Sequence, residues 1–149
     1  MKHFFLFLIC SLSVNFLSAQ QTPVKWSFSA EKVTEQEYNL VLTAKIESGW
    51  SVYSQYLESD DGPVKTAFEF QPSDNLEFIG QTAESGNKKE SYDELFGMNL
   101  IKFSKQAQFT QRVKVTDPSE PVSGFLTYMC CDETSCLPPT DVDFIISLR

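Results

Sequence analysis

Residues 38–47 have the sequence YNLVLTAKIE, and this stretch decides the fold class. Every second position is apolar, and mostly polar side chains lie between: the apolar set is Tyr38, Leu40, Leu42, Ala44 and Ile46. This alternation is typical of a β-strand with one buried face, because successive side chains of a strand point to opposite faces. We therefore predict a strand here, ended by a turn at residues 47–49.

The rest of the chain repeats this pattern of short alternating stretches separated by turn residues. Further strands are expected at residues 26–30, 50–56, 66–70, 76–79, 100–103, 107–115, 123–129 and 142–148. Residues 81–97 are polar and charged, and we interpret them as a long loop, a feature that is often functional. No convincing helix, repeat or second domain is found. About eight or nine short strands predict an all-β sandwich of the immunoglobulin-like type.

The N-terminal residues have the pattern of a secretory, Sec-type signal peptide. Lys2 gives a weakly basic start, residues 4–12 are apolar, and Leu17-Ser18-Ala19 resembles a signal-peptidase site. We expect residues 1–19 to be removed, which leaves an exported domain of residues 20–149. A retained membrane anchor is the alternative, but polar residues interrupt the run, and a spanning helix needs about 20 mostly apolar residues. A lipid anchor on Cys10 is disfavoured because Cys10 lies inside the apolar run.

Charge and composition exclude several classes of function. The net charge of −8 disfavours nucleic acid and anionic membranes as partners, because both attract basic surfaces. The single histidine, His3, lies in the expected signal peptide, so the domain lacks the histidine of Ser-His-Asp and Cys-His catalytic sites and of Cys/His zinc sites. Chemistry must come from cysteine, carboxylates, tyrosine or lysine, and we expect no metal and no cofactor.

Three cysteines remain in the expected domain, all within seven residues: Cys130, Cys131 and Cys136. An odd number leaves at least one thiol unpaired or paired with another molecule. A bridge from Cys131 to Cys136 closes a very small loop, so it adds little to the stability of the fold. Its role is then either chemical or that of a local staple, and the spacing alone leaves both open. The hairpin tip at residues 132–135 can bring these two cysteines opposite each other.

Three motifs follow one another along the domain. The first is Gly49-Trp50-Ser51-Val52-Tyr53, and the second is Asp93-Glu94-Leu95-Phe96-Gly97. The third is Tyr128-Met129-Cys130-Cys131-Asp132-Glu133-Thr134-Ser135-Cys136-Leu137-Pro138-Pro139. In order and spacing they resemble the N-terminal periplasmic domain of the thiol:disulfide interchange protein DsbD, which has an aromatic central strand, a cap loop and an active-site hairpin of this kind. The resemblance covers essentially the whole domain.

The resemblance implies an immunoglobulin-like fold and thiol–disulfide exchange, as in the electron-transfer domain of a protein-disulfide reductase. Cys136 matches the family cysteine that forms mixed disulfides with partners, and Cys131 matches the one that resolves them. Better-known members have five residues between the two cysteines, a spacing that Cys130 would restore. The upstream Tyr128 and the acidic tip fit Cys131 better, and both pairings stay open.

The resemblance also implies the surroundings of the cysteine pair. Leu95 and Phe96 would shield it, and the cap loop consists of Asp93, Glu94, Leu95, Phe96 and Gly97. Ser51 stands where better-known members have a tyrosine. The other residues expected around the pair are Tyr53, Tyr128, Asp132, Glu133 and Pro138. With acidic groups and no cation expected nearby, the reduced thiols would be slow to attack until a partner displaces the cap.

Partners and compartment follow from the same resemblance. In the family this domain takes electrons from a membrane-embedded thiol relay and passes them to periplasmic disulfide isomerases or to thioredoxin-like proteins of cytochrome c maturation. We therefore expect a periplasmic monomer that meets the relay as a separate chain. The main alternative is an exported β-sandwich binding module with a purely structural local disulfide, whose carbohydrate or protein ligand contacts Trp50 and the tyrosines. A third is a subunit that stabilises a larger membrane assembly.

Overall fold

The computed structural model describes residues 22–59 and 61–148, and every regular element in this part is a strand. The strands are β1 (Val24–Lys32), β2 (Glu37–Ile46), β3 (Ser51–Tyr53), β4 (Ala67–Phe70), β5 (Leu76–Asp93), β6 (Met98–Val115), β7 (Val122–Tyr128), β8 (Cys130–Cys131) and β9 (Thr140–Ile146). None of the described residues belongs to a helix of the length and apolarity needed to cross a membrane. The expected signal peptide lies outside the described residues.

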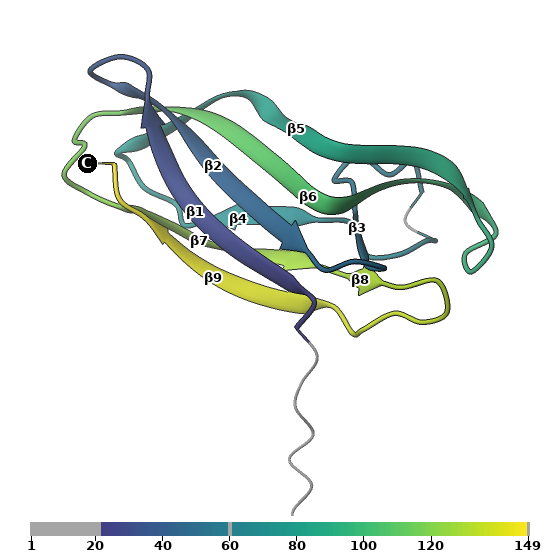
Figure 1. Ribbon diagram of the computed structural model, residues 1–149. Helices are drawn as coiled ribbons and strands as arrows, with labels where there is room; N and C mark the ends of the chain where they lie inside the picture. Colours follow the sequence, from purple (N-terminus) through teal and green to yellow (C-terminus); the bar gives the residue numbers. More distant parts are fainter. Residues whose placement is uncertain (1–21, 60, 149) are drawn as a thin grey trace, which may run out of the picture.

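The strands form two sheets that pack face to face (Figure 1). The larger sheet has the order β1-β2-β6-β3-β8, and β5 is a sixth strand that also pairs with β6. The smaller sheet has the order β4-β7-β9. Neighbouring strands run antiparallel throughout both sheets. The predicted all-β sandwich of immunoglobulin-like type is confirmed.

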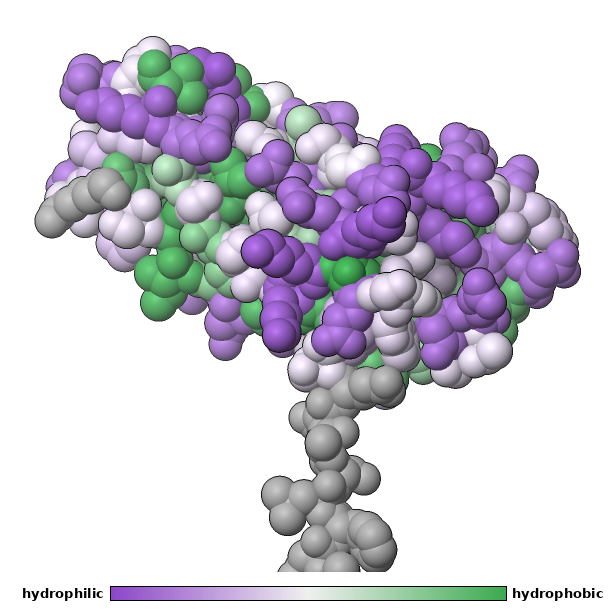
Figure 2. Space-filling model, in the orientation of Figure 1, coloured by the Kyte–Doolittle hydropathy of each residue, from purple (hydrophilic) through white to green (hydrophobic). Residues whose placement is uncertain are grey.

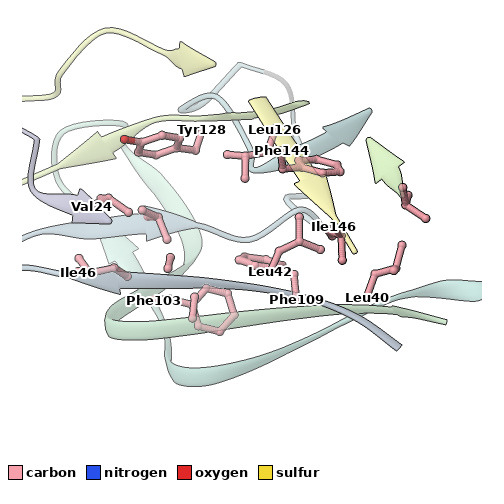
Figure 3. Close-up of a cluster of buried hydrophobic side chains, with 14 of the residues drawn as sticks. Val24, Leu40, Leu42, Ile46, Phe103, Phe109, Leu126, Tyr128, Phe144 and Ile146 are labelled. Carbon is pink, nitrogen blue, oxygen red and sulfur yellow. The ribbon is translucent and has the colours of Figure 1, made fainter. Parts of the chain in front are cut away.

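The hydrophobic core lies between the two sheets. The alternating residues of β2 point into it, and Leu40, Leu42 and Ala44 are fully buried. Figure 3 shows side chains of the two sheets facing one another across this core, among them Phe109 and Phe144. Burying one leucine or phenylalanine side chain contributes about 1.5–3 kcal/mol, so we attribute the stability of the sandwich to this core.

The middle of the chain differs from the sequence-based prediction. The pattern favours a loop over residues 81–97, but residues 81–93 belong to β5, which pairs with β6 as far as Asp93 and Met98. This prediction is wrong because β5 is an edge strand with most side chains in water. Such a strand needs no apolar alternation to form its backbone hydrogen bonds. Residues 76–79 and 100–103 are likewise parts of β5 and β6, not separate strands.

The β5–β6 hairpin brings its turn to the end of the molecule where the cysteines lie (right in Figure 1). Residues 106–114 of β6 pair with β2, whereas residues 102–103 pair with β3. The change occurs around Lys105, a residue of β6 whose φ of 63° marks an irregularity within the strand. Opposite, Gly86 has φ of 130°, and an added Cβ would lie 2.3 Å from the carbonyl oxygen of Gln106, so only glycine fits there.

Candidate functional site

Cys131 and Cys136 form a disulfide across a short hairpin. Cys131 lies in β8, where it pairs with Ser51 of β3. Cys136 faces it across an antiparallel bridge, with the two Cα atoms 4.0 Å apart. On one side of the bridge, the N–H of Leu137 donates to the carbonyl oxygen of Cys130 at 3.0 Å. The backbone therefore holds the two sulfur atoms opposite each other.

Asp132 shapes the tip of this hairpin. Its Oδ1 accepts hydrogen bonds from the backbone N–H groups of Thr134 and Ser135, each at 2.8 Å, and from the Thr134 hydroxyl at 2.9 Å. These bonds lower the pKa of the Asp132 carboxyl group. Aspartate commonly forms such hydrogen bonds in turns, so the Asp132 carboxylate is engaged by groups of the hairpin tip. Glu133 next to it is exposed.

The three cysteines differ in their surroundings. Cys130 and Cys131 are both 3% exposed, whereas Cys136 is only partly buried. Neighbouring residues of a strand point to opposite faces, and Cys130 accordingly lies in the main core as a free thiol whose pKa is raised by burial. Cys131 lies in a second, smaller cluster with Tyr53 and Leu100. In this structure the partner of Cys136 is thus Cys131, and Cys136 is the more accessible of the two.

The cap turn, residues 94–97, joins β5 to β6 and is organised by Asp93. The N–H of Gly97 donates to the carbonyl oxygen of Asp93 at 2.8 Å, and Gly97 has the positive φ of 67° that this turn requires. The Asp93 side chain accepts a hydrogen bond from the N–H of Leu95 at 3.0 Å and another from Lys102 Nζ at 2.9 Å. Asp93 therefore links the turn to Lys102, near the start of β6.

The two apolar residues of the cap turn have different positions. Phe96 packs in the small cluster that contains Cys131 and Cys136, and its ring meets that of Tyr53 edge to face with centroids 6.0 Å apart. Leu95 is 51% exposed and lines the hollow beside the turn. Phe96 is thus the cap-turn residue that belongs to the same buried cluster as the two cysteines, while Leu95 is exposed.

The two tyrosines expected near the pair are buried on different sides of it. Tyr53 is 1% exposed and lies under Phe96; burial raises the pKa of its hydroxyl, and the charges of Asp93 and Cys130 add to this. Tyr128 lies in the main core against Trp26, with ring centroids 5.5 Å apart, and burial also raises its pKa. Both therefore act as neutral packing groups at pH 7. Pro138 is exposed just after the hairpin.

A hollow of about 410 Å³ lies between the cap turn and the cysteine hairpin. Cys131, Asp93 and Leu95 line it, together with Lys89 and Lys102. The expectation that no cation lies near the pair is therefore wrong. Lys102 was missed because its approach to Asp93 depends on the long hairpin, which the sequence does not indicate. Figure 2 shows that side chains at this end are mostly hydrophilic (purple) on the face in view.

Glu84, which has a buried side chain, was not identified from the sequence. Its carboxylate links β5 to the segment after β3 by hydrogen bonds. Glu84 Oε1 accepts a hydrogen bond from the Ser54 hydroxyl at 2.6 Å, and Oε2 accepts one from the Gln55 N–H at 3.3 Å. The Glu84 side chain is only 5% exposed, and Lys88 lies 3.7 Å away. These contacts hold the hairpin stem against the strand that carries Tyr53. They join residues 29 to 30 positions apart, so no local pattern reveals them.

Asp93 should make the stability of the domain depend on pH. Burial opposes ionisation, but the bond and charge of Lys102 and the N–H groups of the turn outweigh it and lower the Asp93 pKa. Such a group stabilises the fold above its unfolded pKa of about 3.9, and the contribution is lost as the pH falls through the native pKa. We expect Asp93→Asn to reduce the free energy of unfolding at pH 7 by about 1 kcal/mol or less, because Lys102 remains partly in water.

Urea unfolding of the wild type and of Asp93→Asn measures this contribution at pH 7 and at about pH 2. The difference between the two proteins should shrink as the pH falls through the lowered pKa of Asp93, where its carboxylate takes up a proton. A difference that is equally large at both pH values would show that the charge of Asp93 is not its source.

Comparisons with known proteins agree with this geometry. The family model described as thiol:disulfide interchange protein DsbD, N-terminal, matches residues 14–147. The DsbD N-terminal domain of Neisseria meningitidis in the reduced form is 27% identical, with a TM-score of 0.55, over 82% of this chain and 84% of that one. A search of curated proteins gives no match.

Two further solved structures share the fold. The complex between the DsbD N-terminal and PilB N-terminal domains of N. meningitidis contains a chain that is 23% identical, with a TM-score of 0.55, over 88% of each chain. The N-terminal periplasmic domain of ScsB from Proteus mirabilis is 18% identical, with a TM-score of 0.56, over 84% of this chain and 45% of that one. The domain described above therefore corresponds to less than half of the ScsB structure.

Proposed function

Because this chain belongs to the family of DsbD N-terminal domains, we propose that it passes reducing equivalents to partner proteins through the Cys131–Cys136 pair. The observation that carries the proposal is a disulfide across a hairpin tip, between one buried and one partly exposed cysteine, in the same cluster as a side chain of the cap turn. Family membership and this pair support thiol–disulfide exchange as the chemistry. The transfer to partners is the part that we propose.

The exchange can be written so that electrons balance. When the domain is reduced, a donor thiolate attacks the sulfur of Cys136, the Cys131–Cys136 bond breaks, and its electron pair stays on Cys131. A second donor thiolate then releases Cys136 and leaves the donor oxidised. When the domain gives electrons away, the Cys136 thiolate attacks the disulfide of the acceptor, and Cys131 then attacks Cys136 to restore the bond. We assign to Cys136 the bond with the partner protein because it is the less buried of the two cysteines.

The proposal includes compartment and partners. Residues 1–19 act as a signal peptide, and the domain of residues 20–149 works as a periplasmic monomer. Its donor is a membrane thiol relay, and its acceptors are thioredoxin-like proteins or disulfide isomerases, including those of cytochrome c maturation. The solved complex of a DsbD N-terminal domain with a PilB domain, and the periplasmic domain of ScsB, support such a role by similarity.

A redox titration tests the proposal against the binding-module alternative. Equilibration in dithiothreitol buffers, followed by alkylation and mass measurement, should reveal a reversible two-electron couple in the range of known oxidoreductases. The circular dichroism of the reduced domain should stay native, because a bridge over five residues contributes little to stability. Cys130→Ala should show the same couple. A bridge that resists reduction, or whose loss unfolds the domain, favours the structural role.

A further inference from the structure

Lys102 lies on the same outer face of the larger sheet as Cys131. In the strand register Lys102 of β6 is opposite Tyr53 of β3, and Ser51, two residues before Tyr53, is opposite Cys131 of β8. Directly opposed residues, and residues two apart on one strand, share a face of a sheet. The hollow beside the cap turn is accordingly lined by both Lys102 and Cys131.

The spacing of the strands puts the Cys131 sulfur within reach of Lys102. The two residues are two strands apart and offset by two residues along the strand, which places their Cα atoms about 12 Å apart. The flexible four-carbon stem of lysine carries its ammonium about 6 Å from its Cα, and the cysteine sulfur covers about another 2–3 Å. A rotamer that extends toward Cys131 therefore carries the ammonium to within about 6 Å of the Cys131 Cα, a range over which its charge still acts on the sulfur.

In the structure, with the cap turn in place, the Lys102 ammonium is paired with the Asp93 carboxylate. Lys102 Nζ lies 2.9 Å from Asp93 Oδ2, and the two side chains are 26% and 11% exposed. Asp93 organises the cap turn, whose Phe96 belongs to the cluster that contains Cys131 and Cys136, and the same carboxylate neutralises Lys102. The other charged side chains lining the hollow are those of Lys89, Glu94, Asp132 and Glu133. Displacing the turn together with Asp93, which precedes it at the end of β5, frees Lys102.

We propose that Lys102 stabilises the thiolate that leaves on Cys131 when a partner thiolate attacks Cys136, and that Asp93 withholds this cation while the cap turn is closed. In that step the bond between the partner sulfur and Cys136 forms, the Cys131–Cys136 bond breaks, and its electron pair remains on Cys131. A thiolate that is stabilised leaves faster. The inference rests on the proposed exchange and adds to it a regulation of the same site: the cap controls charge as well as access.

The rate of reduction of the wild-type disulfide by dithiothreitol, at fixed pH and low salt, tests this inference. We expect Lys102→Met to lower the second-order rate constant about threefold or more, because part of a charge–charge interaction with the leaving thiolate is lost. Lys102→Arg should restore most of the rate. Asp93→Asn should raise it, because Lys102 is then free. Lys114→Met makes the same charge change in an exposed residue at the other end of β6 and should leave the rate unchanged.

The sign of the two effects separates this role from a purely structural one. If Lys102 only holds the turn in shape, Lys102→Met and Asp93→Asn both loosen the cap and both raise the rate, which overturns the inference. Thermal unfolding checks that each variant is folded. If Lys102→Met does not fold, Lys102→Gln removes the same charge and keeps a polar side chain, and it should lower the rate in the same way. An unchanged or raised rate in that folded variant overturns the inference.

The two proposals fail in different ways. Absence of a reversible couple in the wild-type protein rejects the exchange function itself. A normal wild-type couple together with an unchanged rate in Lys102→Met rejects the role of Lys102 alone.

Discussion

Replacing Cys131 by serine is expected to accumulate mixed disulfides between Cys136 and partner proteins, about tenfold or more above the wild type, whereas Cys136→Ser accumulates none. The reason is the difference in accessibility, since Cys136 is partly exposed and Cys131 is 3% exposed. A partly exposed cysteine can bond to a partner, but without Cys131 no other thiol among the described residues is placed to release it. Non-reducing electrophoresis and mass spectrometry of cells expressing each variant measure the trapped species.

Cys130 is the control for this experiment. Its thiol lies in the main core on the other face of the strand, and burial raises its pKa. Cys130→Ala should therefore leave the trapping by Cys131→Ser unchanged. Trapping that disappears with Cys130, or that occurs through Cys131 when Cys136 is absent, contradicts the roles that we propose.

Replacing Phe96 by alanine is expected to speed the reduction of the disulfide by small thiols about tenfold, because attack at sulfur depends on access to it. Phe96 packs in the cluster with Cys131 and Cys136 and against the ring of Tyr53, so its removal opens the cover of the bond. The cost in stability should stay below the roughly 3–5 kcal/mol of a core phenylalanine, because Phe96 is partly exposed. Rates with dithiothreitol, and thermal unfolding, measure both effects.

Leu95 provides the matched control within the same turn. It is 51% exposed and belongs to the lining of the hollow, so Leu95→Ala should change the rate with small thiols little. Equal acceleration by both variants would mean that the turn acts as a whole and that Phe96 has no special part. Unchanged rates in both would remove the shielding role of the cap turn.

Local patterns determined the strands and the cysteine hairpin of this protein. The alternation of residues 38–47 predicts β2 because a strand with one buried face carries its own period. The hairpin tip could also be predicted from local sequence, because Asp132 accepts hydrogen bonds from groups only two and three residues away. The order and spacing of the three motifs also indicated the family whose model matches residues 14–147.

Only the tertiary structure decided the long β5–β6 hairpin, the choice between Cys130 and Cys131, and the cations beside the disulfide. An edge strand such as β5 is held by backbone bonds to β6, which any polar sequence can make, so its side chains carry no signal. Which of two adjacent cysteines faces its partner depends on the register of β8 against β3, because a shift of one residue exchanges the faces. The pairing of Lys102 with Asp93 depends in turn on that hairpin being formed. These features arise from contacts between different strands. Such contacts leave no periodic pattern in the sequence of a single strand, so the sequence alone does not reveal them.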